Sequence, residues 1–448
     1  MNAIVRTAAL TAVFFGLLLC GNARAQDTQH AALRDYVAEQ LPSIVEVYKH
    51  LHTNPELSGT EGNTAKRLAA ELRAAGFEVT EAVGGTGIVA VLKNGDGPTV
   101  LVRSDMDALP ISEDTGADYA SSVRVPGSSG TEVGVMHACG HDIHMSNLIG
   151  TARALSKFKD QWVGTVVLVG QPAEEIAAGA KAMLADGLYE RFPRPHYCLA
   201  LHVDAGLPAG EVGFIEGAFN AAVNSVDIVV YGVGGHGAYP HNTIDPVVTA
   251  AQIVLALQTI VSRETDPTDA AVVTVGVIKG GSKRNVIPDE VRLELTVRTR
   301  KPEVRARVLT SIQRIAEHTA RAAGVPEDKL PKVEVLADQQ TPVTYNDPSL
   351  VQRSVGAMRS ALGNQNVVGR EATMGGEDFG FYGEVDPAIP VFMYRLGSVS
   401  PVDWARFVQG GEALPGLHSA KYLPDPERTI RTGVVSMTSA VMELLKPK

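Results

Sequence analysis

Residues 136–144 (MHACGHDIH) place three imidazoles, a thiol and a carboxylate within nine consecutive positions. Thiolate and neutral imidazole are preferred ligands of zinc and similar divalent ions. Cys139 and His141 flank Gly140, which has no side chain and lets the backbone bend so that both neighbours can turn inward. A lone histidine or cysteine is usually an ordinary loop or core residue, but a cluster of this density predicts a metal site.

Two adjacent acids, Glu174 and Glu175, follow a proline and the apolar run 164–170. Such a continuous run is typical of a strand that is buried on both faces. Adjacent acids elsewhere usually form a solvated surface, but after a buried strand they occupy an ordered loop. One carboxylate could then bind a metal ion while the other acts on water as a general base.

Further candidates stand near the ends of other predicted strands. Asp105 and Asp107 follow one apolar run, and His202 follows another. We expect the strand before His202 to neighbour the strand before Glu174, which makes His202 a ligand candidate rather than a stacked core histidine. His418 follows a loop punctuated by glycine and proline and carries little weight by itself.

Alternating strands and helices predict an open α/β sheet for the first half of the chain. Such sheets bind ligands at the carboxyl ends of their strands, where the candidates above are expected to gather. Apolar periodicity predicts helices over 30–51, 63–75 and 142–158, and strands over 87–92, 99–103, 164–170 and 197–201.

The pattern then changes to the order βαββαβ, which is that of a ferredoxin-like module. Its strands are expected over 223–231, 272–278, 290–298 and 332–336, and its helices over 246–262 and 302–323. Sheet and helix patterns of the first kind resume near Asp347 and run to a final helix over 427–445. We therefore expect an α/β catalytic domain of residues 26–216 and 339–448, with residues 217–338 inserted as a lid or dimerisation domain.

The N-terminus has the layout of a secretory signal peptide. Arg6 precedes an apolar run from Ala8 to Cys20, and Ala23-Arg24-Ala25 supplies a cleavage signal. The run is too short to span a membrane, and the leucine before Cys20 fits a lipoprotein anchor poorly. We expect a periplasmic or secreted enzyme that has no membrane span and is cut near Ala25.

The net charge bears on the kind of partner, and the cysteine content bears on whether a disulfide can form. Cleavage removes two of the 40 Lys and Arg and none of the 50 Asp and Glu, so the mature net charge is about −12, which argues against a nucleic-acid partner. Cys139 and Cys198 remain and could form a disulfide in an oxidising compartment. We favour a ligand role for Cys139 and a buried, small apolar role for Cys198, which stands in an apolar run.

Eight short motifs follow one another along the mature chain: Asp-Met-Asp-Ala-Leu-Pro at 105–110, His-Ala-Cys-Gly-His-Asp at 137–142, Gln-Pro-Ala-Glu-Glu at 171–175, Leu-His-Val at 201–203, Gly-Gly-His-Gly-Ala-Tyr-Pro-His at 234–241, Arg-Asn-Val-Ile-Pro-Asp at 284–289, Gly-Glu-Asp-Phe at 376–379 and Leu-His-Ser at 417–419. In this order they resemble the amidohydrolase branch of the aminoacylase/carboxypeptidase metallopeptidases. That branch holds the hippurate hydrolases and the indoleacetyl-amino acid hydrolases. The resemblance covers nearly the whole mature chain.

The resemblance implies a site for two divalent metal ions, of which zinc, manganese, cobalt and nickel are candidates. It implies that Glu174 is the general base on a metal-bound water and that Asp107 orients a ligand histidine. Many relatives in the wider family carry His-x-Asp where this chain has Asp105-Met106-Asp107, so one histidine ligand is absent here. The ligands that it implies are Cys139, His141, Glu175, His202 and His418.

In that family the inserted domain dimerises, which implies a homodimer formed through residues 217–338. The oxyanion of the reaction needs a donor, and His236 is the candidate because Gly234, Gly235 and Gly237 place it on a close-packed turn, with a purely structural turn histidine as the alternative. In that family such a histidine can reach the partner's active site. Arg284 and Asn285 would hold the carboxylate of the substrate. The predicted reaction is hydrolysis of the amide bond of a small N-acyl amino acid or short peptide, with a dipeptidase or carboxypeptidase of the same fold as the alternative within the family.

Two other classes of protein stay open. A thiol hydrolase would use Cys139 as nucleophile and His137 or His141 as base, and it would leave the acid pair idle. A non-catalytic metal-binding or interaction protein would keep the fold without the reaction. Inactivation by a chelator would oppose the thiol enzyme, and unchanged function in Glu174→Gln would favour the non-catalytic protein.

Overall fold

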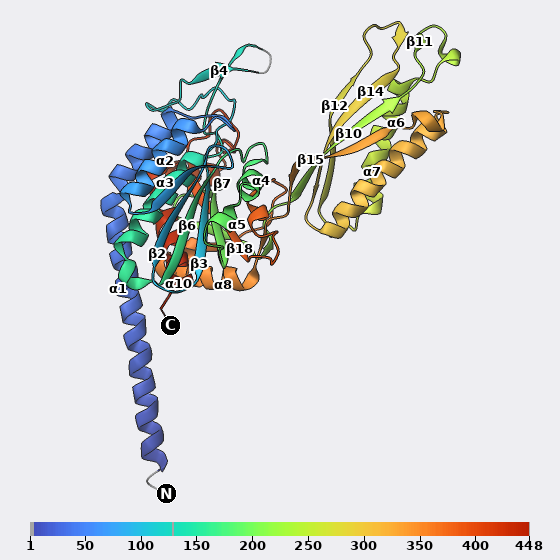
Figure 1. Ribbon diagram of the computed structural model, residues 1–448. Coiled ribbons are helices and arrows are strands. Elements are labelled where there is room, and N and C mark those ends of the chain that lie inside the picture. The colour runs from blue at the N-terminus through green and yellow to red at the C-terminus, as the bar shows by residue number, and fades with distance from the viewer. Residues whose placement is uncertain (1–3, 128–129, 448) are drawn as a thin grey trace.

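The structure, a computed structural model, describes residues 4–127 and 130–447, with side chains from residue 28 onward. It has two lobes, each built on its own sheet (Figure 1). The larger sheet takes strands from both ends of the chain, and the smaller sheet is formed by the segment between them. The predicted fold class, an open α/β sheet with an inserted ferredoxin-like domain, is confirmed.

The larger sheet contains ten strands. Its main path is β1-β2-β6-β3-β7-β18-β16-β9, and β8 pairs with both β17 and β18. The central strands β6, β3, β7 and β18 are mutually parallel, whereas β1 and β2 at one edge are antiparallel. The strands are β1 Glu78–Val83, β2 Gly87–Asn94, β3 Thr99–Asp105, β6 Gly164–Gln171, β7 Tyr197–Pro208, β8 Val212–Phe214, β9 Gly217–Ala218, β16 Tyr345–Asn346, β17 Val367–Gly369 and β18 Val391–Val399.

Helices cover both faces of this sheet, so its central strands are buried on both sides. Val100 and Val102 of β3 face the core under α1, α2, α3, α8 and α10, while Leu101 faces the core under α4 and α5. This alternation is the two-residue period of a strand. The helices are α1 Ile4–Thr53, α2 Gly62–Ala74, α3 His141–Lys157, α4 Gly179–Ala185, α5 Leu188–Arg191, α8 Pro348–Leu362 and α10 Pro426–Leu444.

Helix α1 extends far beyond the predicted start at residue 30 (Figure 1). The signal peptide predicted over residues 1–25 lies outside the residues whose side chains are described and stays a prediction. Cys139 and Cys198 are both buried free thiols. The predicted burial of Cys198 as a small apolar residue is therefore confirmed.

The smaller lobe is here called the lid. Its sheet has the strand order β12-β14-β10-β15, and all the pairings in this sheet are antiparallel. With α6 and α7 packed against it, this is the predicted βαββαβ arrangement. β9 still pairs in the larger sheet and β15 continues to Thr341, while the predicted limits of the insertion, 217 and 338, stay predictions. The elements are β10 Ala222–Tyr231, α6 Pro246–Thr259, β12 Ala271–Gly280, β14 Glu290–Thr299, α7 Pro302–Ala322 and β15 Lys332–Thr341.

Helix α6 has two apolar sides. Together with the π-helical turn that follows it, it forms the one described segment, Pro246–Glu264, that is long and apolar enough to cross a membrane by length and composition alone. Ile253 and Leu257 are buried in the core of the lid. Val248 and Leu255 face outward, and Leu255 is 72% exposed. Clustered exposed apolar side chains usually mark a surface that another molecule covers.

Candidate metal centre

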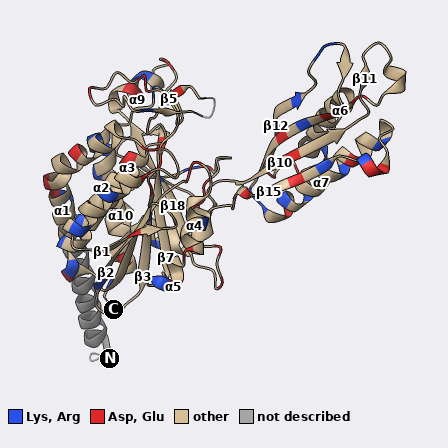
Figure 2. Ribbon diagram, turned by 45° about the horizontal axis from the view of Figure 1, so that its top comes forward, with Lys and Arg blue, Asp and Glu red and all other residues tan. Residues whose placement is uncertain are grey.

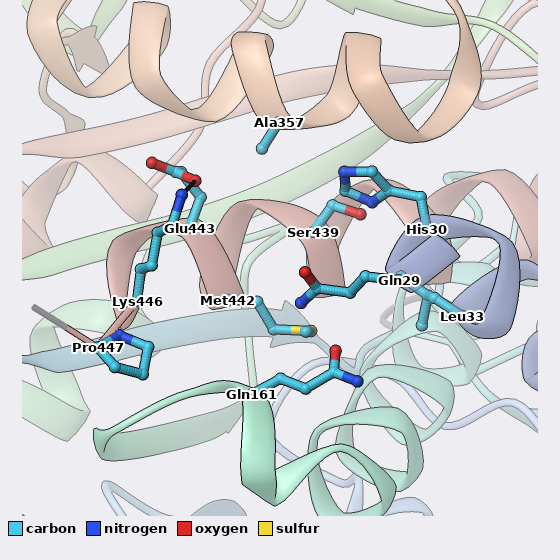
Figure 3. Close-up of a pocket in the computed structure, with 10 residues that line it drawn as sticks. All are labelled: Gln29, His30, Leu33, Gln161, Ala357, Ser439, Met442, Glu443, Lys446 and Pro447. Carbon is cyan, nitrogen blue, oxygen red and sulfur yellow. Dashed lines mark ion pairs between the residues drawn. The ribbon is translucent and has the colours of Figure 1, made fainter. Parts of the chain in front are cut away.

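A cleft of about 810 Å³ lies between the two lobes and is lined from both sides. Cys139, Glu174, Glu175, His202 and His418 line it from the larger lobe, and Arg298 is among the residues that line it from the lid. A second hollow of about 510 Å³ lies between α1, α8 and α10 and is lined by none of the predicted site residues (Figure 3). The chemistry predicted from the sequence therefore belongs to the cleft between the lobes.

The turn at Gly140 brings the first two predicted ligands together. Gly140 has φ +76°, which favours glycine, and a Cβ there would come within 2.6 Å of a methyl group of Val203. Cys139 precedes this turn and His141 begins α3 after it. The ligand atoms of Cys139, His141 and His202 lie within 4.8 Å of one another. The separation of Cys139 Sγ from His202 Nε2 is 3.5 Å.

The other predicted ligands join the same cluster. Cys139 also groups with Glu175 and His418, and His141 groups with Glu174 and Glu175. His418 Nε2 lies 3.6 Å from Glu175 Oε2, and His141 Nε2 lies 3.8 Å from Glu175 Oε1. The structure thus gathers all five predicted ligands, which come from stretches up to about 280 residues apart in the sequence.

Two orphaned atoms test whether a metal ion fits this cluster. His141 Nε2 and Glu175 Oε1 are both buried, and neither has a hydrogen-bond partner among the described residues. Buried polar atoms normally have partners. A divalent cation between a carboxylate oxygen and an imidazole nitrogen would satisfy both, and the set of thiol, imidazole and carboxylate donors suits zinc-like ions. The residues therefore fit the predicted metal.

Asp107 lies where an orienting acid should lie. Its Oδ1 is 3.3 Å from His141 Nδ1. Its Oδ2 accepts hydrogen bonds from Ser58 Oγ at 2.7 Å and from the backbone N–H of Glu175 at 3.0 Å. One carboxylate therefore contacts one predicted ligand and fixes the backbone of another.

Asp105 begins the motif Asp105-Met106-Asp107, and both of its carboxylate oxygens have hydrogen-bond partners. Oδ1 accepts a hydrogen bond from His144 Nδ1 at 2.6 Å, and Oδ2 accepts one from Arg103 Nη1 at 2.6 Å. His144 Nε2 in turn accepts the backbone N–H of Val203 at 2.9 Å, so its proton is on Nδ1. The chain of contacts from Arg103 to Val203 supports the strand that carries His202.

Two expectations about His202 were wrong. Its strand β7 does not neighbour β6, the strand before Glu174, because β3 lies between them. His202 also does not end its strand, because β7 continues to Pro208. The order of strands in a parallel sheet depends on how the crossover connections pack, and the order along the sequence does not give it.

Burial raises the pKa of both Glu174 and Cys139, and the two shifts have different chemical consequences. Burial, and after it the carboxylates of Glu377, Asp378 and Glu175, raise the pKa of Glu174 well above its usual value. A raised pKa suits a group that must take a proton and later return it near neutral pH. Burial, followed by the charge of Glu175, raises the pKa of the Cys139 thiol, which opposes a metal-free thiolate nucleophile.

The predicted substrate contacts in the lid lie apart from this cluster within one chain. His236 is in β11 (Gly235–His236), which pairs with β13 (Val286–Ile287) at the far end of the lid (Figure 1). The backbone N–H of Gly237 donates to the carbonyl of Asn285 at 2.9 Å, so His236 and Asn285 are neighbours. His236, Arg284 and Asn285 do not line the cleft of their own chain.

Sequence reasoning missed three charged residues that line the cleft: Asp204, Arg298 and Arg395. Glu377 also lines the cleft, together with Gly375 and Gly376, as expected from the sequence, which predicts that residues 375–378 shape the wall of the cleft. Arg395 had a usable signal, because it is the only charged residue in the apolar strand 391–399 (VFMYRLGSV). A charge in the middle of a buried strand at the catalytic edge of a sheet indicates a cleft.

A model of peptidase family M20/M25/M40 matches residues 101–405. The chain belongs to this family. As a member of peptidase family M20/M25/M40, the protein is a hydrolase of the metallopeptidase and amidohydrolase type. The resemblance drawn from the eight motifs is confirmed.

Similar proteins cover nearly the whole chain. A probable hydrolase of Synechocystis is 38% identical over 92% of this chain and 98% of its own length. An N-acetylcysteine deacetylase of Bacillus subtilis is 36% identical over 81% of this chain and 90% of its own length. An indoleacetyl (IAA)-amino acid hydrolase of Arabidopsis thaliana is 36% identical over 77% of this chain and 75% of its own length.

Solved structures agree. A putative aminohydrolase from methicillin-resistant Staphylococcus aureus matches with a TM-score of 0.80 and 30% identity, over 92% of this chain and 99% of its own. A Bacillus subtilis protein described as a dinuclear metal binding peptidase from the M20 family matches with a TM-score of 0.73 and 30% identity, over 91% of this chain and 99% of its own.

Proposed function

We propose that this protein is an exported, dinuclear metal-dependent amidohydrolase that cleaves the amide bond of N-acyl amino acids or short peptides. The observation that carries the proposal is the convergence of Cys139, His141, Glu175, His202 and His418 on one cluster beside Glu174 in the cleft. Relatives named as a deacetylase of an N-acyl amino acid and as hydrolases of amino acid conjugates support the same bond type.

We assign the five clustered residues as ligands of two divalent ions, which when bound supply Lewis acidity toward water and the acyl carbonyl. Glu174 takes the proton of the attacking water and returns it to the leaving nitrogen, and the burial that raises its pKa favours the uptake of that proton. Asp107 holds the ring of His141 in one orientation.

The substrate carboxylate needs a cationic partner, and Arg298 is the residue of the lid that supplies one within the cleft. Its Nη1 donates to the backbone carbonyl of Met374 at 2.8 Å, which ties the lid to the larger lobe. His236, Arg284 and Asn285 would reach a cleft only in a neighbouring copy. Their position supports a homodimer in which each lid completes the other subunit's site.

The dimer surface that we propose consists of the outer side of α6 and the edge strand β12. Val248 and Leu255 on α6 and Val277 and Ile278 on β12 are exposed apolar side chains of the lid. An unpaired edge strand can pair with a second copy. Exposed apolar side chains near such an edge favour association with a second copy over contact with water.

The test uses residues 26–448 after removal of metal with a chelator. Release of free amino acid is assayed from N-acetyl, N-benzoyl and dipeptide substrates before and after zinc, manganese, cobalt or nickel is added back. Loss of activity on stripping and its return with one ion support the proposal. Full activity after complete metal removal would overturn it and make Cys139 the leading nucleophile.

Export is tested separately by expressing residues 1–448 and locating the product. We expect the processed chain, beginning near Gln26, outside the cytoplasm. Retention of an unprocessed chain in the cytoplasm would contradict the signal peptide and leave the chemistry untouched.

A further inference from the structure

Arg395 occupies a position in the cleft that neither the metal cluster nor Glu174 explains. It lies on β18, directly opposite His202 of the neighbouring parallel strand β7. Its side chain lines the same cleft as Cys139 and Glu174. The rest of β18 is apolar or small and buried, so this strand contributes one charge to the site.

The guanidinium of Arg395 is held in place by neighbouring side chains, but no carboxylate among the described residues pairs with its charge. Its Cζ lies 4.2 Å from the centre of the Phe219 ring, and its Nη2 donates to Thr373 Oγ1 at 3.0 Å. Within the described part of the chain it forms no ion pair with a carboxylate. A guanidinium has five N–H donors, so most of its donors are free to meet another molecule.

Two other arginines of the larger lobe near the cleft, Arg103 and Arg370, differ in this respect. Arg103 is fully buried and donates to Asp105, Glu377 and Asp378. Arg370, beside Arg395, lies 3.9 Å from Asp204. Burial lowers the pKa of Arg395 from its ordinary value. The loss of water around the guanidinium therefore outweighs the attraction of the nearby acidic groups. A partly desolvated cation without a carboxylate partner is stabilised when an anion binds.

A glycine beside Arg395 leaves room for a second arginine side chain, that of Arg370. Gly213 faces it across the β8–β18 pair. A Cβ at Gly213 would lie 3.2 Å from the Cβ of Arg395 and 2.6 Å from the Cγ of Arg370. Glycine therefore leaves the space through which Arg370 passes beside Arg395. Arg298 stands on the lid side of the same cleft.

We propose that Arg395 binds an anionic group of the substrate that is distinct from the α-carboxylate, so that preferred substrates carry a second carboxylate. This rests on the proposed function, in which Arg298 meets the α-carboxylate. Arginine recognises carboxylates through two parallel N–H···O bonds, and stacking on Phe219 holds the plane of the guanidinium for such a pair. The second carboxylate belongs either to the acyl group or to the amino acid side chain.

The experiment compares matched substrate pairs on the metal-loaded enzyme. N-acetyl-glutamate against N-acetyl-glutamine tests an anion on the amino acid side, and N-succinyl-alanine against N-butyryl-alanine tests one on the acyl side. We expect the wild type to favour the charged member of one pair by at least about tenfold in kcat/KM. That ratio should fall by about 10- to 100-fold in Arg395→Met and recover in part in Arg395→Lys.

Arg353→Met is the matched control, because Arg353 also lies over an aromatic ring, that of Tyr197, but outside the cleft. Its ratios should equal those of the wild type. Equal preference for both members of both pairs in the wild type, or unchanged ratios in Arg395→Met, would overturn the proposal.

If no amide is cut under any metal, the proposed function fails but Arg395 can still be judged by calorimetric binding. N-acetyl-glutamate or N-succinyl-alanine should then bind the wild type at least about tenfold more tightly than its neutral counterpart, and Arg395→Met should lose the difference. Equal affinities for charged and neutral members would overturn the proposal by this route as well.

Discussion

His52 is a buried residue with an unusual environment close to the metal cluster. Its Nδ1 lies 2.7 Å from Asp142 Oδ2 and its Nε2 lies 3.0 Å from Glu113 Oε1. Burial lowers the pKa of His52, but hydrogen bonds to Asp142 and Glu113 outweigh it and raise the pKa to about 9. Asp142 directly follows the predicted ligand His141, so this ion pair braces the first turn of α3.

The first prediction concerns the pH dependence of stability. The folded pKa of His52 exceeds the unfolded value of about 6.5, so its contribution is complete below pH 6.5 and disappears as pH rises through 9. The stability gap between wild type and His52→Gln should shrink by about 2 to 3 kcal/mol between pH 6 and pH 9.5. Urea unfolding at several pH values measures it.

His50→Gln is the control, since His50 is exposed two residues away on the same helix. Its difference from the wild type should stay near zero at every pH. A constant gap for His52→Gln would show that His52 does not carry a proton in the folded protein.

At the residue scale, the sequence predicted the groups that have local signatures and missed those that depend on packing. Cys139 and His141 stand in a dense cluster, and Glu174 follows a strand that its apolar run reveals. The ion pairs of His52 join residues 61 and 90 positions apart, and no local pattern marks them. Arg395 was visible only as a charge in an apolar strand.

At the scale of elements, strand β3 holds the catalytic edge of the sheet together through Arg103. This side chain is fully buried and connects the end of β3 with two other segments. Its Nε donates to Gln171 Oε1 of β6 at 2.9 Å, and its Nη2 donates to Glu377 Oε1 and Asp378 Oδ1 at 2.9 and 3.0 Å. The loop that carries Glu377 lines the cleft, so Arg103 links the metal cluster to the cleft wall.

The second prediction is that Arg103→Met strongly destabilises the larger lobe. The change leaves buried carboxylates without their cation, which typically costs about 3 to 5 kcal/mol. Denaturant unfolding gives the value. Arg67→Met removes an ion pair with Glu71 whose arginine is 37% exposed, and it should cost less than about 1 kcal/mol. Equal losses for both variants would refute the role given to Arg103.

The elements themselves were mostly predictable, and their order in the sheet was not. Apolar runs and helical periodicity located β3, β6, α3 and both helices of the lid within a few residues. The place of β3 between β6 and β7 depends on crossover packing, and the wrong neighbour assigned to His202 followed from that. The apolar outer side of α6 was hidden because periodicity marks a buried face and not what covers the opposite one.

At the scale of the whole molecule, the chain separates its proposed functions between two lobes. The larger lobe holds the metal cluster, and the lid holds Arg298, His236 and an exposed apolar surface. Lys, Arg, Asp and Glu residues are spread over the ribbons of both lobes (Figure 2). His236 and Asn285 do not line the cleft of their own chain, which makes the proposed dimer part of the proposed mechanism.

The third prediction tests that dimer. Leu255→Glu places a charge in the proposed interface, so the variant should shift toward monomer in light scattering after gel filtration. Activity should fall with it, because His236 would no longer reach a partner's cleft. Arg307→Glu, an exposed change on the other lid helix, should leave the mass and activity unchanged. A wild type that is monomeric and fully active at all concentrations would contradict the dimer.

The most direct test of the central claim compares Glu174→Gln with Glu175→Gln, two neighbouring and chemically identical changes. Metal content per chain and kcat are measured for each. Glu174→Gln should retain two ions per chain and lose at least about 10³-fold in kcat, as expected for a general base. Glu175→Gln should lose bound metal together with activity. Full activity in Glu174→Gln, or equal metal loss in both variants, would contradict the division of roles between these two acids.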